Sequence, residues 1–192
     1  MNYKRLGSIA TIKFCSVTPS RAKPSNVPAK WLVCANFMAD NEVDFSPTAN
    51  FVMPDEEWLL NQNDIVIKRI SPAYVNYIDF NPDGVYCGNN LIIVTPGKEV
   101  EAKYLAMILN EKIGELSRDS SIGAVMKSIS RNDLELLEIP FPEKGKQQLI
   151  GNLWLKSIEL KKKRIKLAEL ENTKVKCIIQ NNIIASGGIN NV

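Results

Sequence analysis

The fold is decided where SSIGAVMKSISRNDL at residues 120–134 gives way to IPFPEKGKQQLI at residues 139–150. Pro140 and Pro142 end any helix before them, because proline has no backbone N–H and keeps the preceding residue out of the helical region. From Lys146 onward, apolar residues recur at alternating intervals of four and three, which is the spacing of one helix face. A globular part therefore gives way to one long helix at this point.

One face of this predicted helix carries a repeating stripe. Its members are Trp154, Ile158, Lys161, Ile165, Ala168, Asn172, Val175, Ile179 and Asn182, with Leu153, Leu160 and Leu167 beside them. A helix of about 35 to 40 residues is about 55 Å long, which is more than the domain before it can cover. We therefore expect contact with a partner helix through Trp154, Ile158, Leu160, Ile165, Leu167, Ala168, Val175 and Ile179. The polar members can fix the register of pairing; packing of the helix onto its own domain is the alternative.

Length and composition set the outer limits. A chain of 192 residues with 45% apolar and 23% charged residues is typical of a soluble globular protein with one core and one appendage. We predict a globular domain over 1–145, a spacer and dimerisation helix over 146–184 and a flexible tail over 185–192. No apolar run reaches membrane-spanning length and no signal peptide is evident, so we expect a cytoplasmic protein without a membrane partner.

Residue patterns predict an α+β fold, in which a mixed α/β globular domain is followed by a long C-terminal coiled-coil helix. The expected strands are 6–14, 31–35, 65–70, 74–78 and 86–94, and the expected helices before the long one are 101–116 and 131–137. Ser130 and Asp133 have the spacing of a capping box, which would begin the second of these helices. Asn-Pro-Asp-Gly at 81–84 is typical of a turn.

Catalytic chemistry has few candidates in this chain. The four cysteines are far apart in the sequence and there is no histidine, which argues against a zinc site and against a histidine base. Asp64 and Asp79 stand at strand ends, where single carboxylates are more often turn or cap residues than catalytic pairs. We therefore expect no catalytic residue, no metal and no cofactor.

Charge is distributed unevenly along the chain. Residues 1–145 hold 15 Lys and Arg against 18 Asp and Glu, whereas residues 146–192 hold 9 against 3. A protein that holds nucleic acid by bulk charge alone would have a basic domain. The globular part therefore needs a local basic surface, or partners, in order to bind DNA.

Two segments of the globular part are candidates for contact with DNA. The candidate residues are Lys68, Arg69, Ser71, Tyr74, Ser121, Gly123, Lys127 and Arg131. Arg69 could reach a guanine with two hydrogen bonds, although a strand with two solvent-facing cations would look the same. Small residues at 120–127 would let the backbone approach a groove, although a plain connector would also look like this. The run of cations at 161–164 is by default a solvated helix face.

The order of several short motifs resembles the specificity (S) subunit of type I restriction-modification systems over nearly the whole chain. They are YKRLGSIA at 3–10, NDIV at 63–66, GNNLIIV at 88–94, YL at 104–105, SIG at 121–123, IPFP at 139–142 and QLI at 148–150. Two positions depart from the family pattern. Asn63 stands where a Gly-Asp-Ile turn is common, and residues 144–148 lack the acidic residue that often precedes Gln.

The resemblance implies a target-recognition domain that reads DNA for a partner methyltransferase and does no chemistry itself. With one such domain and one helix, the chain would be a half-subunit, and two antiparallel copies would read two inverted half-sites. S-adenosylmethionine would bind the methyltransferase subunits, which methylate adenine, and a translocating nuclease subunit would join in a full restriction system. The alternative is an interaction protein that binds or competes for the methyltransferase through its helix without specific DNA recognition.

Overall fold

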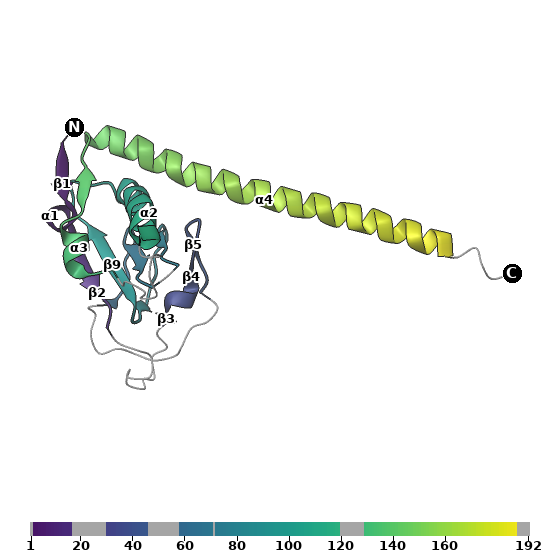
Figure 1. Ribbon diagram of the computed structural model, residues 1–192, viewed down its shortest axis with the longest axis horizontal. Coiled ribbons are helices and arrows are strands. Elements are labelled where there is room, and N and C mark those ends of the chain that lie inside the picture. The colour runs from purple at the N-terminus through teal and green to yellow at the C-terminus, as the bar shows by residue number, and fades with distance from the viewer. Residues whose placement is uncertain (1, 17–29, 46–57, 71, 120–128, 188–192) are drawn as a thin grey trace. The chain divides into compact units, whose positions relative to one another are not determined.

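The computed structural model describes residues 2–16, 30–45, 58–70, 72–119 and 129–187 (Figure 1). The chain divides into two units, Met1–Trp154 and Leu155–Val192, which we call unit 1 and unit 2. Unit 1 contains every strand and the shorter helices that are described, and the described part of unit 2 is helical throughout. The predicted fold class, an α+β domain followed by a long C-terminal helix, is confirmed.

An antiparallel sheet of four strands forms the centre of unit 1. Its order is β2 (Ala10–Phe14), β9 (Leu91–Pro96), β6 (Ile65–Lys68) and β7 (Val75–Tyr77). Val66 and Ile93 on the inner strands pack into a cluster with Trp31 and Trp58, and alternate strand residues point to the opposite face. Helix α2 (Ala102–Asp119) contacts β7. The inner strands are apolar because both of their faces are buried.

Three shorter pairs of strands surround this sheet. β1 (Tyr3–Arg5) pairs antiparallel with β10 (Glu138–Pro140), β3 (Lys30–Leu32) pairs parallel with β8 (Val85–Cys87), and β4 (Phe37–Met38) pairs antiparallel with β5 (Glu42–Val43). Short helices join them at α1 (Leu6–Ile9), η2 (Cys34–Asn36) and α3 (Arg131–Glu135). β1 and β10 bring the two ends of unit 1 together, since residues 3–5 pair with residues 138–140.

Two asparagines attach the β4–β5 hairpin to the sheet. The side-chain amide of Asn76, which is fully buried, donates to the carbonyls of Met38 and Glu42, at 3.0 Å each. Asn41 donates from its amide nitrogen to the Tyr77 carbonyl at 3.1 Å and accepts from the Tyr77 N–H. The side chain of Asn41 thus makes the two hydrogen bonds that a neighbouring strand would make with β7.

The largest difference from the sequence prediction lies in residues 6–14, which are not one strand. Leu6 and Ile9 are both buried and three residues apart, which fits a helical turn, and α1 therefore separates β1 from β2. The Leu6 N–H donates to the Leu137 carbonyl at 2.9 Å, so a distant segment stabilises this turn. The predicted strand at 86–94 is likewise two strands, β8 and β9.

The other predicted elements are present with altered ends. The strand expected at 31–35 stops at Leu32, the strand expected at 65–70 stops at Lys68, and the strand expected at 74–78 covers Val75–Tyr77. The helix expected at 101–116 runs to Asp119, and the helix expected at 131–137 stops at Glu135. Just after Lys68, for example, the Arg69 N–H donates to the Asn90 carbonyl at 2.9 Å, and such a bond to a distant segment leaves no periodic signal in the sequence.

Two predictions based on local sequence are confirmed. The Ser130 hydroxyl accepts from the Asp133 N–H at 3.2 Å, and the Asp133 carboxylate accepts from the Ser130 N–H at 3.3 Å, which makes the capping box of α3. At the Asn-Pro-Asp-Gly turn, Gly84 has a φ of 68° and the Val85 N–H donates to the Pro82 carbonyl at 3.0 Å. Both features depend on residues within three positions of one another.

Helix α4 (Lys144–Gly187) is 44 residues long, begins two residues before the predicted 146 and continues three residues into the predicted tail. Its first turns belong to unit 1. Gln147 is 1% exposed, accepts from the Glu101 N–H at 3.0 Å and donates to the Pro142 carbonyl at 2.8 Å. At Gly151 a Cβ atom would lie 2.7 Å from the Lys103 Cβ. These contacts hold the start of α4 against the start of α2. Within the described ranges, no helix has the length and hydropathy needed to cross a membrane.

Candidate functional site

Four of the predicted DNA-binding residues meet at one end of the four-stranded sheet. Strands β2 and β6 both finish there, because each pairs antiparallel with β9, so that Phe14 lies opposite Ile92 and Lys68 lies opposite Leu91. We call Phe14, Lys68, Arg69, Tyr74 and Arg131 the basic cluster. The other four predicted residues, Ser71, Ser121, Gly123 and Lys127, lie outside the described residues.

Both arginines of the basic cluster lie over the ring of Phe14. The guanidinium carbon of Arg131 is 4.8 Å from the ring centroid, and that of Arg69 is 5.6 Å from it, both within the range of cation–π attraction. Arg69 also donates from Nε to the Ile129 carbonyl at 2.9 Å, and Arg131 donates from Nη1 to the Ile12 carbonyl at 3.1 Å. Each guanidinium is therefore oriented by one ring and one main-chain carbonyl.

The lysine of the basic cluster has its own aromatic neighbour. The Lys68 ammonium lies 5.1 Å from the centroid of the Tyr74 ring, and the Lys68 N–H donates to the Tyr74 carbonyl at 2.8 Å. The predicted juxtaposition of a cation and an aromatic ring is therefore present in the fold. The carboxylate of Glu135 lies 3.4 Å from Nη1 of Arg131 and forms an ion pair with it.

Three cations gathered around two rings make a local positive surface on a domain whose overall charge is negative. Guanidinium and ammonium groups can donate to phosphate oxygens or to base edges. Because Arg69 is bonded through Nε to Ile129, its side chain also supports the fold at this end of the sheet. Its predicted contact with a base remains a prediction.

Phe14 is the member of the basic cluster that the sequence did not point to. It is the last residue of β2, and its neighbours Arg69 and Arg131 are distant in sequence. Only the pairing of β2 with β9 and of β9 with β6 brings these segments together. The sequence offered one signal that could have singled out Phe14. It is an aromatic residue at the end of a predicted strand, and a segment rich in cations, residues 21–30, follows it in the chain.

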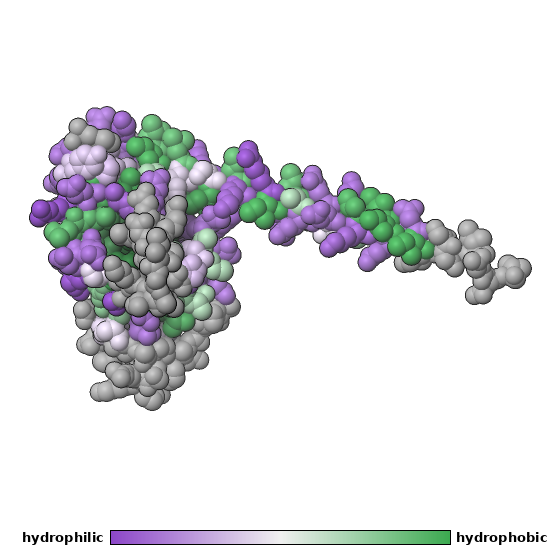
Figure 2. Space-filling model, in the orientation of Figure 1, coloured by the Kyte–Doolittle hydropathy of each residue, from purple (hydrophilic) through white to green (hydrophobic). Residues whose placement is uncertain are grey.

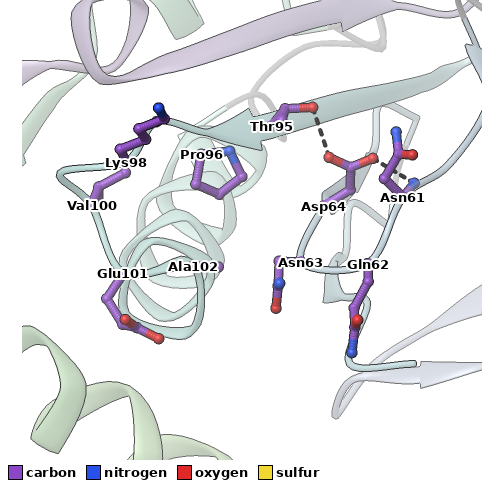
Figure 3. A pocket seen from close by; sticks show the side chains of 11 residues that line it. Asn61, Gln62, Asn63, Asp64, Thr95, Pro96, Lys98, Val100, Glu101 and Ala102 are labelled. Carbon is purple, nitrogen blue, oxygen red and sulfur yellow. Dashed lines mark hydrogen bonds between the residues drawn. The ribbon is translucent and has the colours of Figure 1, made fainter. Parts of the chain in front are cut away.

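A polar pocket lies at the opposite end of the same sheet, between the start of β6, the end of β9 and the start of α2 (Figure 3). Its lining includes Asn61, Gln62, Asn63, Asp64, Thr95, Lys98 and Glu101. Asp64 is 1% exposed and accepts from the Thr95 hydroxyl at 2.7 Å and from the Asn61 N–H at 2.8 Å. Burial raises the pKa of Asp64, and these hydrogen bonds partly oppose that shift. These hydrogen bonds give Asp64 the role of a turn residue, which is the role that the sequence predicted for it.

Asn63 explains how the chain tolerates its departure from the Gly-Asp-Ile turn. Its φ is 72°, a left-handed conformation that glycine adopts freely and that asparagine tolerates better than other residues. The Tyr77 hydroxyl donates to its side-chain oxygen at 2.6 Å and stabilises it there. The turn before β6 is therefore formed without glycine.

The described residues contain no group of three His, Cys, Asp or Glu side chains placed to hold a metal ion. The four cysteines are free thiols. The buried neighbour Cys15, followed by burial itself, raises the pKa of Cys87 well above its ordinary value, which keeps this thiol protonated and unreactive.

Most of the residues on α4 that were predicted to contact a partner helix have exposed apolar side chains. The exposed fractions of Ile165, Val175 and Ile179 are 49%, 54% and 53%, and Leu160 and Leu167 are exposed as well. Ala168 is exposed, whereas Trp154 and Ile158 are half-buried. Figure 2 shows hydrophobic residues recurring along this helix between hydrophilic ones.

Comparison with protein families gives one match over most of the chain. A sequence model described as the type I restriction modification DNA specificity domain matches residues 1–172. Comparison with curated protein sequences gave no match. A solved structure from a study of complex assembly and conformational transition of the type I R-M system is similar, with a TM-score of 0.70 and 21% identity, over 94% of this chain and 44% of that chain.

Two further solved structures are similar in fold. The HsdS subunit from Thermoanaerobacter tengcongensis has a TM-score of 0.65 at 21% identity, over 87% of this chain and 39% of that one. The type I restriction-modification S subunit from M. genitalium has a TM-score of 0.51 at 18% identity, over 79% of this chain and 37% of that one. This chain thus spans less than half the length of each of these three structures.

Proposed function

The chain belongs to the family of type I restriction modification DNA specificity domains, and from that premise we propose that it reads the sequence of double-stranded DNA for a methyltransferase. In this proposal the chain does no chemistry itself and acts in the cytoplasm. S-adenosylmethionine binds the methyltransferase subunits, and a translocating nuclease subunit joins in a full restriction system. The resemblance found in the sequence and the family match point to the same function.

The observation that carries the proposal is the basic cluster. It supplies the local positive surface that DNA binding requires of a domain with a net negative charge. Arg69 and Arg131 are held by Ile129 and Ile12 before any ligand arrives, so binding need not order their side chains. In this proposal they contact phosphates or base edges, together with Lys68 and Tyr74.

We further propose that two copies of the chain pair through α4. Three of the supporting side chains, Ile165, Val175 and Ile179, lie on one helix face and are each about half exposed. A two-fold axis between the copies would place two identical half-sites in inverted orientation, separated by a spacer that the helices set. The half-subunit form of the family, with one recognition domain and one helix, corresponds to this arrangement.

Recruitment of the methyltransferase would use a second apolar surface of α4. Leu160, Leu167 and Leu170 are 50%, 58% and 55% exposed and lie away from the stripe that contains Ile165. Covering these leucines with methyltransferase helices would remove apolar surface from water. The same helix can then hold a second copy and a methyltransferase at once.

The test is selection of DNA from a random-sequence duplex library by the purified chain, at low salt, with and without type I methyltransferase subunits. We expect an enriched motif of two inverted half-sites around a spacer. An enriched motif without inverted symmetry would contradict pairing of two copies. No enriched motif in either arm would contradict DNA reading and favour an interaction protein that binds the methyltransferase through its helix.

A further inference from the structure

Taking the antiparallel arrangement that the family resemblance implies, we infer that the helices of two copies pair in a single register, in which Ile165 of one copy faces Ala168 of the partner subunit. This inference rests on the proposed pairing through α4 and adds the contacts that determine it. The stripe of unit 2 has a seven-residue repeat, and Ile158, Ile165, Asn172 and Ile179 take one of its two inner positions. Lys161, Ala168, Val175 and Asn182 take the other.

In this register the inner layers that lie within unit 2 on both helices join side chains that complement each other. Ile165 faces the partner's Ala168, and Ile158 faces the partner's Val175, so a large side chain meets a smaller one. Lys161 faces the partner's Asn172, whose side-chain oxygen can accept from the ammonium. Lys161 and Asn172 thus meet each other and leave Ile158 and Ile165 to apolar partners.

A parallel arrangement of the same helices lacks this match. Each inner residue would then face its own copy, so that Lys161 would meet the partner's Lys161 inside the interface and two like charges would be buried together. Ala168 would meet the partner's Ala168, which leaves the layer underfilled. Lys161 and Ala168 therefore fit the antiparallel arrangement that the family resemblance implies better than a parallel one.

Charges beside the stripe select the register. In an antiparallel pair the residues that flank the inner positions face their equivalents across the interface. Here Lys162 faces the partner's Glu169, and Arg164 faces the partner's Glu171. Two-fold symmetry repeats each contact, so four attractive pairs result. All four side chains are exposed in the single chain, where they are available to a partner.

A slip of one repeat in either direction turns these contacts into repulsions. In one direction Lys162 meets the partner's Lys162, and Arg164 meets the partner's Arg164. In the other direction Glu169 meets the partner's Glu169, and Glu171 meets the partner's Glu171. Like charges held face to face are unfavourable. The neighbouring registers are therefore disfavoured by the residues that stabilise the proposed one.

Charge reversal in the full-length chain tests the flanking contacts. Lys162→Glu should raise the dissociation constant of the dimer about five- to twenty-fold, because two attractive pairs become repulsive, and adding Glu169→Lys should restore it. Lys166→Glu is the matched control, since this exposed lysine points away from the interface and should change the constant less than threefold. Sedimentation equilibrium measures all four chains. An equal effect of Lys162→Glu and Lys166→Glu, or no recovery in the double variant, would overturn the register.

Disulfide trapping tests the register through one facing pair, Ile158 and the partner's Val175. On a Cys177→Ser background, chains with Ile158→Cys and chains with Val175→Cys are oxidised with oxidised glutathione, separately and mixed. Within one helix these positions are about 25 Å apart, too far for a disulfide. We expect a covalent dimer only in the mixture. A covalent dimer from Ile158→Cys alone indicates parallel helices and overturns the inference, as does the absence of any covalent dimer. A dimer trapped in another register would leave the proposed DNA reading intact, because the DNA selection tests that independently.

Discussion

Ile92 and Ile93 of β9 are 0% and 1% exposed, whereas Ile178 and Ile179 of α4 are 50% and 53% exposed. The two pairs have the same residue type but opposite surroundings. In unit 1, antiparallel neighbours and packed side chains cover both faces of the strand. The described part of unit 2 consists of one helix, and no second element of that unit covers it. Unit 1 therefore buries its isoleucines within its own core, whereas the described part of unit 2 leaves its isoleucines about half exposed.

Polar groups differ between the units in the same way. The buried polar side chains of unit 1, such as Asn76 and Gln147, hydrogen-bond main-chain groups of other segments. In unit 2 the described hydrogen bonds of Thr173 and Asn182 go to carbonyls four residues earlier on the same helix. Long-range bonds stabilise unit 1, and local bonds stabilise unit 2. Substitutions in unit 1 should therefore change mainly the free energy of unfolding, and substitutions in unit 2 should change mainly the proposed pairing of two copies.

The largest expected effect comes from a truncation in the core of unit 1. Ile93→Ala should lower the free energy of unfolding by about 2 to 5 kcal/mol, because it removes buried methyl groups and leaves a cavity. The matched change in unit 2, Ile179→Ala, should lower stability less and only at concentrations where the chain pairs. Urea denaturation at two protein concentrations measures both. A loss for Ile93→Ala that depends on concentration would contradict the independence of unit 1.

Ile165→Glu should raise the dissociation constant of the dimer about a hundredfold, which corresponds to about 2.7 kcal/mol. The new carboxylate would lie in the apolar interface without a partner charge. Gln180→Glu adds the same charge outside the stripe and should leave pairing unchanged. Light scattering compares the three chains. If the unaltered chain is a monomer at micromolar concentration, unit 2 does not pair with itself unless the methyltransferase is present.

Arg69→Ala tests whether this arginine reads a base or only supports the fold. Loss of a guanine contact should weaken binding of the selected DNA by about 1 to 3 kcal/mol and relax specificity at one position of each half-site. Lys166→Ala in unit 2, at an exposed lysine outside the paired face of α4, should at most weaken binding to all sequences alike. Binding to matched and mutated duplexes distinguishes the two results. An unchanged motif, with a lower melting temperature from loss of the bond to Ile129, would assign Arg69 a structural role.

Gln147 and Gln148 at the start of α4 allow the same substitution to be compared at a buried and at an exposed position. Gln147→Leu should cost about 1 to 2 kcal/mol, because the Glu101 N–H and the Pro142 carbonyl would lose their buried partner. Gln148 is exposed, so Gln148→Leu should change stability by no more than about 0.5 kcal/mol. Thermal unfolding of the two variants makes the comparison. Equal losses would show that the start of α4 is not held by Gln147.

The smallest expected effect concerns pH. Burial raises the folded-state pKa of Asp64 above its ordinary value of 3.8. Its contribution to stability is therefore fully present below the unfolded pKa and is lost as pH rises through the folded pKa. Asn cannot titrate, so the stability of Asp64→Asn relative to the unaltered chain should increase as pH rises from about 4 to about 7. Urea midpoints across this range measure the trend, and a relative stability that falls instead would contradict the raised pKa.

Local spacing in the sequence determined much of the architecture. The interval of three to four residues along α4 fixed one helix and its apolar face, since residues three and four apart lie on one side of a helix. Ser130 and Asp133 determined the start of α3 because a capping box needs only residues within one turn. The DNA-binding candidates Lys68 and Arg69 followed from adjacent residues with Tyr74 nearby.

Tertiary structure alone decided the rest. Arg131 bonds to the carbonyl of Ile12, a residue 119 positions away, and both arginines reach the ring of Phe14. The turn at Leu6–Ile9 likewise depends on a carbonyl from residue 137. Such contacts depend on which strands become neighbours in the sheet. Local sequence spacing sets the periodicity of each segment, but the pairing partner is chosen by packing between segments far apart in the chain.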